Sequence, residues 1–416
     1  MGYMQYKKLE SSGIAWIQDT PSHWRIKRLK FATDLVNNKV SAEDSALPYL
    51  GLEHIESWTG RRIDGEISNS EGLASRFSTG DVLFGKLRPY LAKVHLAQQA
   101  GLISSEALVI RSKTEVHSEF LKYYMLSRDF INIVDSSTYG SKMPRASWDF
   151  IGNLPVLLPE IDEQQAIARF LDFKTAQIDT LIAKKQTLLE RLTEKRTALI
   201  SHAVTKGLAP TVPMKDSSVE WLGEIPAHWK IVALHYVAHL KSGESITALQ
   251  LNEDGEYPVF GGNGFRGYYD RFTHDGNYIL IGRQGALCGN INIAKGKFFA
   301  SEHAIVVNPD WVFDTNWMGY QLLSMNLNQY SVSAAQPGLS AEVIGRLKIA
   351  FPPHDEQQTI ARFLDEKLER IHAQRQKIED VIARLQEYRS SLITNAVAGK
   401  IDVRDLPVPT MAVMEA

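Results

Sequence analysis

The chain has 416 residues, of which 44% are hydrophobic and 23% charged, and its formal net charge is -2. The length exceeds what one compact core accommodates and predicts two or more domains, while the balanced charge excludes a chain that is basic throughout, so any nucleic-acid surface must be local. Because there is no run of about 18 apolar residues, no apolar stretch near the start and only one cysteine, Cys288, we expect a cytoplasmic protein without membrane span, signal peptide or internal disulfide.

The first segment opens on a motif that recurs later in the chain. Residues 16–26 read Trp-Ile-Gln-Asp-Thr-Pro-Ser-His-Trp-Arg-Ile, and residues 221–231 read Trp-Leu-Gly-Glu-Ile-Pro-Ala-His-Trp-Lys-Ile, at an offset of 205 residues. A repeat at such long spacing indicates a duplicated unit.

Short strands punctuated by glycine are predicted in the segment after each copy of the motif. Each segment has two apolar runs flanked by turn residues, and a helical stretch follows them. The predicted strands and helix cover 81–86, 107–110 and 118–128 in the first segment, and 278–283, 304–307 and 316–327 in the second. We therefore predict two α+β domains.

A second repeated motif opens a long charged helix after each segment. Asp-Glu-Gln-Gln-Ala-Ile-Ala-Arg-Phe-Leu-Asp at 162–172 returns at 355–365 with one residue changed, at an offset of 193. Proline precedes both copies, so Asp162 and Asp355 are the expected N-cap residues, each with glutamine at the N3 position. The expected helix stops are two glycines, Gly207 and Gly399.

Apolar residues recur every seven positions along both helices and predict a coiled coil in which the helices pair. At about 1.5 Å per residue the first helix extends roughly 60 Å, which suits a spacer better than a core helix. In the first helix, the first seam of the coiled coil is predicted at Leu171, Ile178, Lys185, Leu192 and Leu199, and the second seam at Leu181 and Leu188. In the second helix, the first seam is predicted at Leu364, Ile371, Ile378, Leu385 and Leu392, and the second seam at Gln374 and Val381.

The two repeated motifs, together with Tyr-Pro-Val-Phe-Gly-Gly-Asn-Gly at 257–264, resemble the specificity subunits of type I restriction-modification systems. The resemblance covers about residues 16–400. It implies two target-recognition domains, each reading half of a split double-stranded DNA sequence, and two antiparallel helices that hold the domains apart and dock two methyltransferase subunits. It also implies restriction/translocase subunits in the same complex. S-adenosylmethionine, ATP and magnesium would serve those partners, whereas this chain would need no cofactor and would not be catalytic.

The resemblance assigns residues 1–160 and 207–353 to the target-recognition domains, 161–206 and 354–400 to the helical spacers, and 401–416 to a C-terminal tail. The expected fold class is α+β, with an internal pseudo-two-fold repeat of globular domains separated by an antiparallel coiled coil. Two reading units suit a two-part DNA site whose halves lie about 34–36 Å apart, one helical turn. Since the two domains differ in sequence, the two halves of the target should differ too.

Candidate DNA-contacting residues lie mainly in glycine-containing loops beside the predicted strands. Arginine and lysine reach phosphates or guanine edges, asparagine and glutamine pair with adenine, and glycine lets the backbone approach the duplex. A basic surface loop can also be merely solvated, so each set carries more weight than its members. The sets are Lys86, Arg88, Tyr90, Lys142 and Arg145 in the first domain, and Asn263, Arg266, Tyr268, Arg283, Gln284 and Gln336 in the second. The best-aligned pair is Lys86 with Arg283, because each follows a strand that ends on glycine.

Two other functions stay open: a duplicated coiled-coil scaffold without DNA specificity, and a self-contained DNA-modifying enzyme. The second would need an intact methyltransferase or nuclease motif, which the sequence lacks. The glycines of 262–267 match a dinucleotide fingerprint, but they lead into a predicted strand and not into a helix. His23 and His228 each lie beside proline and tryptophan without a second ligand nearby, so packing or a turn hydrogen bond is favoured over a metal site.

Overall fold

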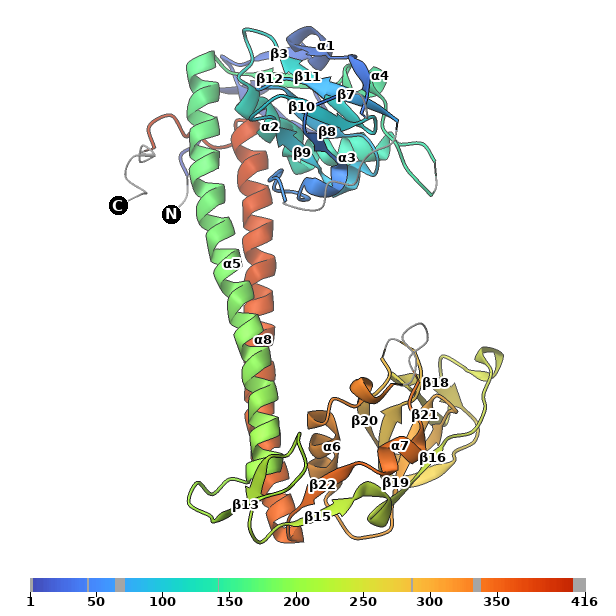
Figure 1. The fold of residues 1–416 in the computed structure, drawn as a ribbon. Helices are drawn as coiled ribbons and strands as arrows, with labels where there is room; N and C mark the ends of the chain where they lie inside the picture. The colour runs from blue at the N-terminus through green and yellow to red at the C-terminus, as the bar shows by residue number, and fades with distance from the viewer. Residues whose placement is uncertain are drawn as a thin grey trace. The chain divides into compact units, whose positions relative to one another are not determined.

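The computed structural model describes residues 3–42, 45–63, 72–140, 142–285, 287–331 and 338–406. The chain forms two compact units (Figure 1), residues 1–185 with 379–416 and residues 186–378. Each unit contains one globular domain of mixed helix and strand, the beginning of one long helix and the end of the other. The predicted α+β class with an internal repeat is confirmed.

Two four-stranded sheets form the domain of the first unit. One has the order β4 (Thr33–Leu35), β11 (Ala107–Ser112), β8 (Val82–Gly85), β9 (Val94–Leu96). The other has the order β5 (Lys39–Ser41), β7 (Leu73–Phe77), β10 (Gly101–Ser104), β6 (Tyr49–Leu50). Two-stranded ladders join β1 (Leu9–Ser11) to β2 (Asp19–Pro21) and β3 (Arg25–Arg28) to β12 (Pro155–Leu158). The helices are α1 (Leu29–Ala32), η1 (Leu52–His54), η2 (Pro89–Leu91), α2 (Ser118–Leu126), α3 (Arg128–Ser136) and α4 (Trp148–Ile151).

One six-stranded sheet forms the domain of the second unit. Its order is β16 (Ala238–Ser242), β21 (Ala304–Pro309), β19 (His274–Gly282), β20 (Ile291–Ala300), β17 (Tyr257–Gly261), β18 (Gly264–Tyr269). Two ladders repeat those of the first unit: β13 (Met214–Asp216) with β14 (Glu224–Pro226), and β15 (Lys230–Ala233) with β22 (Lys348–Phe351). The helices are η3 (Leu234–Tyr236), η4 (Ala248–Gln250), α6 (Thr315–Ser324), η5 (Leu327–Tyr330) and α7 (Ala341–Gly345).

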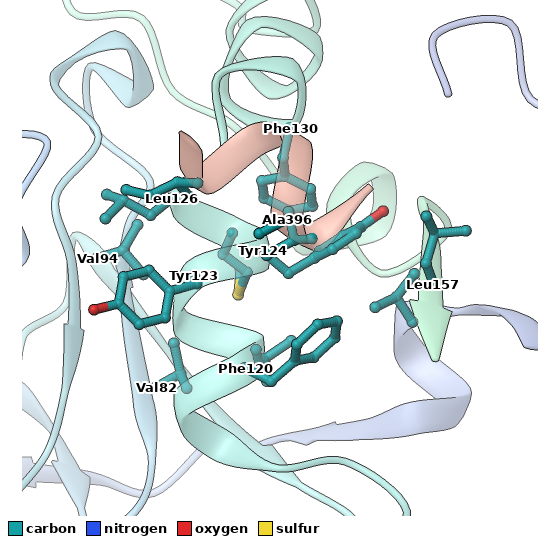
Figure 2. Close-up of a cluster of buried hydrophobic side chains, with 14 of the residues drawn as sticks. Val82, Val94, Phe120, Tyr123, Tyr124, Leu126, Phe130, Leu157 and Ala396 are labelled. Carbon is teal, nitrogen blue, oxygen red and sulfur yellow. The ribbon is translucent and has the colours of Figure 1, made fainter. Parts of the chain in front are cut away.

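The two long helices are α5 (Ile161–Lys206) and α8 (His354–Val397). In each unit the end of one helix completes the core of the domain. Figure 2 shows Ala396 of α8 beside Tyr124 of α2 and Phe130 of α3 in the first unit. In the second unit, Val204 of α5 belongs to the same buried cluster as Trp317 of α6 and Ile360 of α8. Within each unit the beginning of one helix therefore lies beside the end of the other, and the pair is antiparallel.

The helix boundaries correct one prediction and confirm another. Asp162 and Asp355 are not N-caps, because both helices begin earlier and place these carboxylates in the first turn. The first helical hydrogen bonds already run to the carbonyls of the residues before each helix, Glu160 and Pro353. Acidic side chains in the first turn still favour the positive end of the helix dipole. The two glycine stops are confirmed by left-handed backbone angles, φ 75° at Gly207 and 71° at Gly399.

The first predicted seam of the helices is confirmed, and the second is wrong. The residues of the first seam are buried or half-buried along both helices. Leu181, Leu188 and Val381 of the second are 47%, 40% and 40% exposed, and Gln374 is also exposed. The second seam lies four residues after each member of the first, not three. It consists of Thr175, Ile182 and Leu189 on α5, and Leu368, Arg375, Ile382 and Arg389 on α8. Because α5 has apolar residues at both spacings, the periodicity alone could not choose between them.

The glutamate of the repeated helix motif receives the side chains of the repeated His-Trp motif. The Glu163 carboxylate accepts hydrogen bonds from His23 Nε2 at 2.8 Å and Trp24 Nε1 at 3.2 Å. Glu356 accepts them from His228 at 2.8 Å and Trp229 at 3.0 Å. The two motifs are thus the two halves of one contact, which fastens the start of each helix to its domain. Both histidines thus make a long-range contact with a carboxylate, 140 and 128 residues away in the sequence, and not the turn hydrogen bond that was one of the two expected roles.

Two further residues of the helix motif fasten the helices in the same way. The Gln164 amide accepts from the His117 backbone N–H at 2.8 Å, and the Gln357 amide accepts from the Asp314 backbone N–H at 2.9 Å. The closing aspartate accepts a tyrosine hydroxyl in each copy. These pairs are Tyr123 with Asp172 and Tyr320 with Asp365, both at 2.5 Å. The near-identical repeat is therefore explained by contacts that are themselves repeated.

One contact between domain and helices belongs to the first unit. Arg389 of α8 and Asp179 of α5 are both buried and joined at 2.9 Å, and Arg389 also donates to the Trp58 carbonyl at 2.8 Å. The positions related by the 193-residue offset, Arg196 and His372, are exposed. A loop of the first domain is thus tied to both helices through a buried ion pair.

Candidate nucleic-acid interface

Two loops of the first domain come together at the end of β8. Leu87 forms a β-bridge with Arg145, which also bridges to Tyr139. The Arg88 backbone N–H donates to the Pro144 carbonyl at 2.8 Å, and the Ala146 N–H donates to the Lys86 carbonyl at 3.0 Å. The structure therefore brings the predicted loop after β8 beside the predicted loop at 139–145.

The candidate residues of the first domain differ in solvent exposure and in whether their side chains already have a partner within the protein. Arg88 is exposed and has a left-handed backbone, φ 51° and ψ 64°, which a non-glycine residue adopts only under local constraint. Tyr90 is 45% exposed, Lys142 is exposed and Lys86 is half-buried. The Arg145 guanidinium is bound at both ends by Glu106, at 2.9 and 3.2 Å, and this hydrogen bonding raises its pKa. Arg145 thus already has an acidic partner inside the protein.

The second domain joins its loops by an equivalent bridge. Gln284 bridges to Gly338, and the Leu339 backbone N–H donates to the Arg283 carbonyl at 2.9 Å. The N–H of Lys86 donates to the Glu106 carbonyl and that of Arg283 to the His303 carbonyl, both at 2.9 Å. Lys86 and Arg283 thus occupy matching backbone positions, as the alignment predicted. Gln336 lies outside the described residues.

The β17–β18 hairpin of the second domain lies against the loop after β19. A Cβ added to Gly282 would lie 2.5 Å from the Gly262 carbonyl oxygen, so the backbones touch where both residues are glycine. At the hairpin turn, Asn263 accepts a hydrogen bond from Asn290 Nδ2 at 3.3 Å. Arg266 is exposed beyond the turn, and Tyr268 is half-buried. The glycine fingerprint is thus a strand hairpin, as expected, and not the start of a helix.

Several further residues at these two places were not among the predicted candidates. They are unusually apolar for surface loops, or carry an amide: Tyr139 (65% exposed), Met143 (48%), Phe265 (54%), Leu287 (48%) and the half-buried Asn290. Large apolar residues within glycine- and asparagine-containing loops were the available signal. The prediction rested mainly on basic residues and therefore did not include them.

The described residues contain neither a cluster of potential metal ligands nor a candidate membrane-spanning helix. Within those ranges, His, Cys, Asp and Glu side chains do not gather in threes as metal ligands would. Burial raises the pKa of the Cys288 thiol, which makes it a poor nucleophile. Among the residues that the structure places, no helix combines the length and hydrophobicity of a bilayer span.

Comparisons with known proteins place both units in one family. A sequence model of the type I restriction modification DNA specificity domain matches residues 73–191 and 226–382. The specificity subunit of the type I restriction enzyme EcoprrI of Escherichia coli is 44% identical over 133 residues, 31% of this chain and 33% of that protein. For the EcoDI specificity subunit of the same species, the match spans 42% of its length at 28% identity. The MjaVIII specificity subunit of Methanocaldococcus jannaschii is 22% identical, with 97% of this chain and 99% of that protein covered.

Solved structures share the fold over almost the whole chain. A chain from a structure describing complex assembly and conformational transition of the type I R-M system has a TM-score of 0.74 at 18% identity. That match covers 92% of this chain and 99% of the other. The HsdS subunit of Thermoanaerobacter tengcongensis has a TM-score of 0.51 at 19% identity, with 92% and 98% covered. At these identities the likeness is one of fold.

Proposed function

Because the chain belongs to the family of type I restriction-modification DNA specificity proteins, we propose that it selects the DNA target of a type I restriction-modification complex. The domains at 1–160 and 207–353 each read one half of a bipartite, asymmetric double-stranded target. The observation that carries this proposal is the matched pair of loop bridges, Leu87 with Arg145 and Gln284 with Gly338. One backbone arrangement presents different side chains in the two domains, as two different half-sites would require.

The helical segments at 161–206 and 354–400 set the spacing of the half-sites and dock two methyltransferase subunits. Their continuity supports this role, since α5 has 46 residues and α8 has 44. At about 1.5 Å per residue each is longer than the roughly 34–36 Å between half-sites one helical turn apart. Inserting one heptad into α5 should change the number of unspecified bases or abolish assembly. Unchanged spacing together with full activity would refute the spacing role.

The proposed role is non-catalytic and cytoplasmic. The methyltransferase subunits use S-adenosylmethionine to methylate adenine, and the restriction/translocase subunits use ATP and magnesium to cleave unmodified DNA. The DNA contacts come from the described candidates in the loops that the two bridges join and in the β17–β18 hairpin, with Arg145 contributing less because Glu106 already holds it.

A genome-wide adenine-methylation map tests the proposal. The partner methyltransferase is expressed with and without this chain, and a split motif that appears only with the chain confirms the specificity role. Exchanging residues 16–158 for the equivalent domain of a relative should then alter one half of the motif only. If the maps with and without the chain are identical although both proteins are expressed, the specificity role is refuted and the chain is a coiled-coil scaffold without DNA specificity.

A further inference from the structure

The β17–β18 hairpin of the second domain carries an amide and an exposed aromatic ring, and a second amide, that of Asn290 in the loop after β19, is bonded to the first. β17 and β18 are joined by the two residues Gly262 and Asn263, and β18 is the edge strand of the sheet. Phe265, two residues beyond Asn263, is 54% exposed, although its ring packs edge-on against Phe260 and Tyr268 at 6.4 and 5.1 Å between centroids. Half of a large apolar side chain thus remains in water at the tip of a two-stranded ribbon. Such a ribbon fits the major groove of B-DNA.

Glycine contacts hold this tip in place beside the loop after β19. A Cβ on Gly282 would lie 2.5 Å from the Gly262 carbonyl oxygen and 2.7 Å from that of Leu287. A Cβ on Gly262 would lie 3.0 Å from the His303 carbonyl oxygen. The turn is therefore packed backbone to backbone against its neighbours, and its side chains project from a supported frame.

The amide pair leaves one donor and one acceptor for a ligand. Asn290 donates to Asn263 at 3.3 Å, so Asn263 Nδ2 and Asn290 Oδ1 have no hydrogen-bond partner among the described residues. If both side-chain amides are rotated by about 180°, Asn263 becomes the donor and Asn290 the acceptor, and one donor and one acceptor still remain free for a ligand. Adenine presents the complementary set in the major groove, the N7 acceptor and the N6 donor, and the 5-methyl group of its thymine lies in the same groove.

We propose that the second domain reads an A·T pair, with Asn263 and Asn290 bonded to the adenine edge and Phe265 packed against the thymine 5-methyl group. This inference rests on the proposed function and makes it more specific. It adds Asn290 and Phe265 to the residues that determine specificity. It also assigns to Phe265 an apolar contact with a methyl group, to which the charged group of a basic residue has nothing to bond.

The test uses the full chain assembled with its methyltransferase subunits and short duplexes that carry the mapped motif. Each thymine is replaced in turn by uracil, which lacks only the methyl group, and affinity is measured by fluorescence anisotropy at fixed salt. At one thymine of one half-site, this replacement should weaken the affinity of the wild-type complex about fourfold, which corresponds to the burial of one methyl group. The Phe265→Ala complex should bind the thymine duplex about fourfold more weakly and be indifferent to that replacement. Phe272→Ala, which removes another exposed ring from the same domain, should keep the wild-type sensitivity.

The amides are tested at the paired adenine. Replacing it by purine, which lacks the N6 amino group, should weaken wild-type binding about tenfold, and the Asn263→Ala/Asn290→Ala variant should show no such loss. The inference is overturned if no uracil substitution changes the affinity of the wild-type complex. It is also overturned if the Phe265→Ala complex still loses affinity when the methyl group is removed. A motif without an A·T pair in the half assigned to the second domain also overturns it. In each of these cases the complex still binds its motif, whereas failure of the proposed function would leave no motif to test.

Discussion

The two units fasten their helices alike but hold their domains differently. In the first, Glu163 accepts three hydrogen bonds, from Tyr6, His23 and Trp24, whereas Glu356 of the second accepts two. The first unit alone buries an arginine–aspartate pair between its helices and ties a domain loop to it, among the residues that the structure describes. The near-identical motifs thus maintain a common frame. The differences lie where each domain meets that frame and where its loops face solvent.

The largest expected difference is at the buried ion pair. Arg389→Ala should destabilise the first unit by about 3 kcal/mol, because it leaves the buried Asp179 carboxylate with only Arg61, at 3.5 Å, among the described cations. Arg196→Ala, at the equivalent exposed position, should change stability by less than about 0.5 kcal/mol. Hydrogen exchange measured by mass spectrometry gives the local stability of each unit separately. Equal effects of the two variants would show that the buried pair does not distinguish the units.

A smaller difference is expected at the two fastening glutamates. Glu163→Gln should cost about 2 kcal/mol, because the buried carboxylate is replaced by an amide that accepts more weakly and brings its own donor. Glu356→Gln should cost about 1 kcal/mol, since that side chain is 30% exposed and has two partners. Exchange protection at the start of α5 and of α8 measures the two effects. A larger loss from the second variant would contradict the ranking.

The corrected seam makes a third comparison, between adjacent residues of α5. Ile182→Ala should cost about 1 kcal/mol, because Ile182 is half-buried and packs against the core of the first unit. Leu181→Ala removes a side chain of similar size that is 47% exposed, and should cost less than about 0.5 kcal/mol. Circular dichroism during urea unfolding can rank them. The reverse order would restore the seam that the sequence periodicity suggested.

The smallest expected effect is a pH dependence of the first unit. Burial lowers the pKa of His95, whose Nδ1 bonds the Gly60 carbonyl at 2.8 Å. The folded state therefore holds this imidazole neutral while the unfolded chain takes up a proton more readily. Its contribution to stability is present above the ordinary pKa of about 6.5 and is lost as the pH falls below it. Asn292 takes the place of His95 in the second unit, because it pairs with Leu280 of β19 as His95 pairs with Leu83 of β8. His95→Asn should therefore reduce the fall in Tm between neutral and mildly acidic pH. An unchanged slope would exclude His95 as the source.

The duplication, the strands beside the candidate loops and the long helices follow from the sequence by itself. Identical motifs at fixed offsets and apolar residues seven apart are local patterns, and glycine stops act within one turn of helix. For the same reason the match of Lys86 with Arg283 is visible in the sequence, since each follows a strand that ends on glycine.

Only the tertiary structure decided what those patterns contact. That Glu163 receives His23 and Trp24 depends on residues about 140 positions apart, a pairing that no local spacing encodes. Tertiary packing also decided that Ile182 and not Leu181 lies in the seam, because Ile182 packs against the buried cluster of the first unit while Leu181 is 47% exposed. The amide pair of Asn263 and Asn290 exists because two glycines let separate loops touch. Contacts of this kind are set by which surfaces meet when the chain folds.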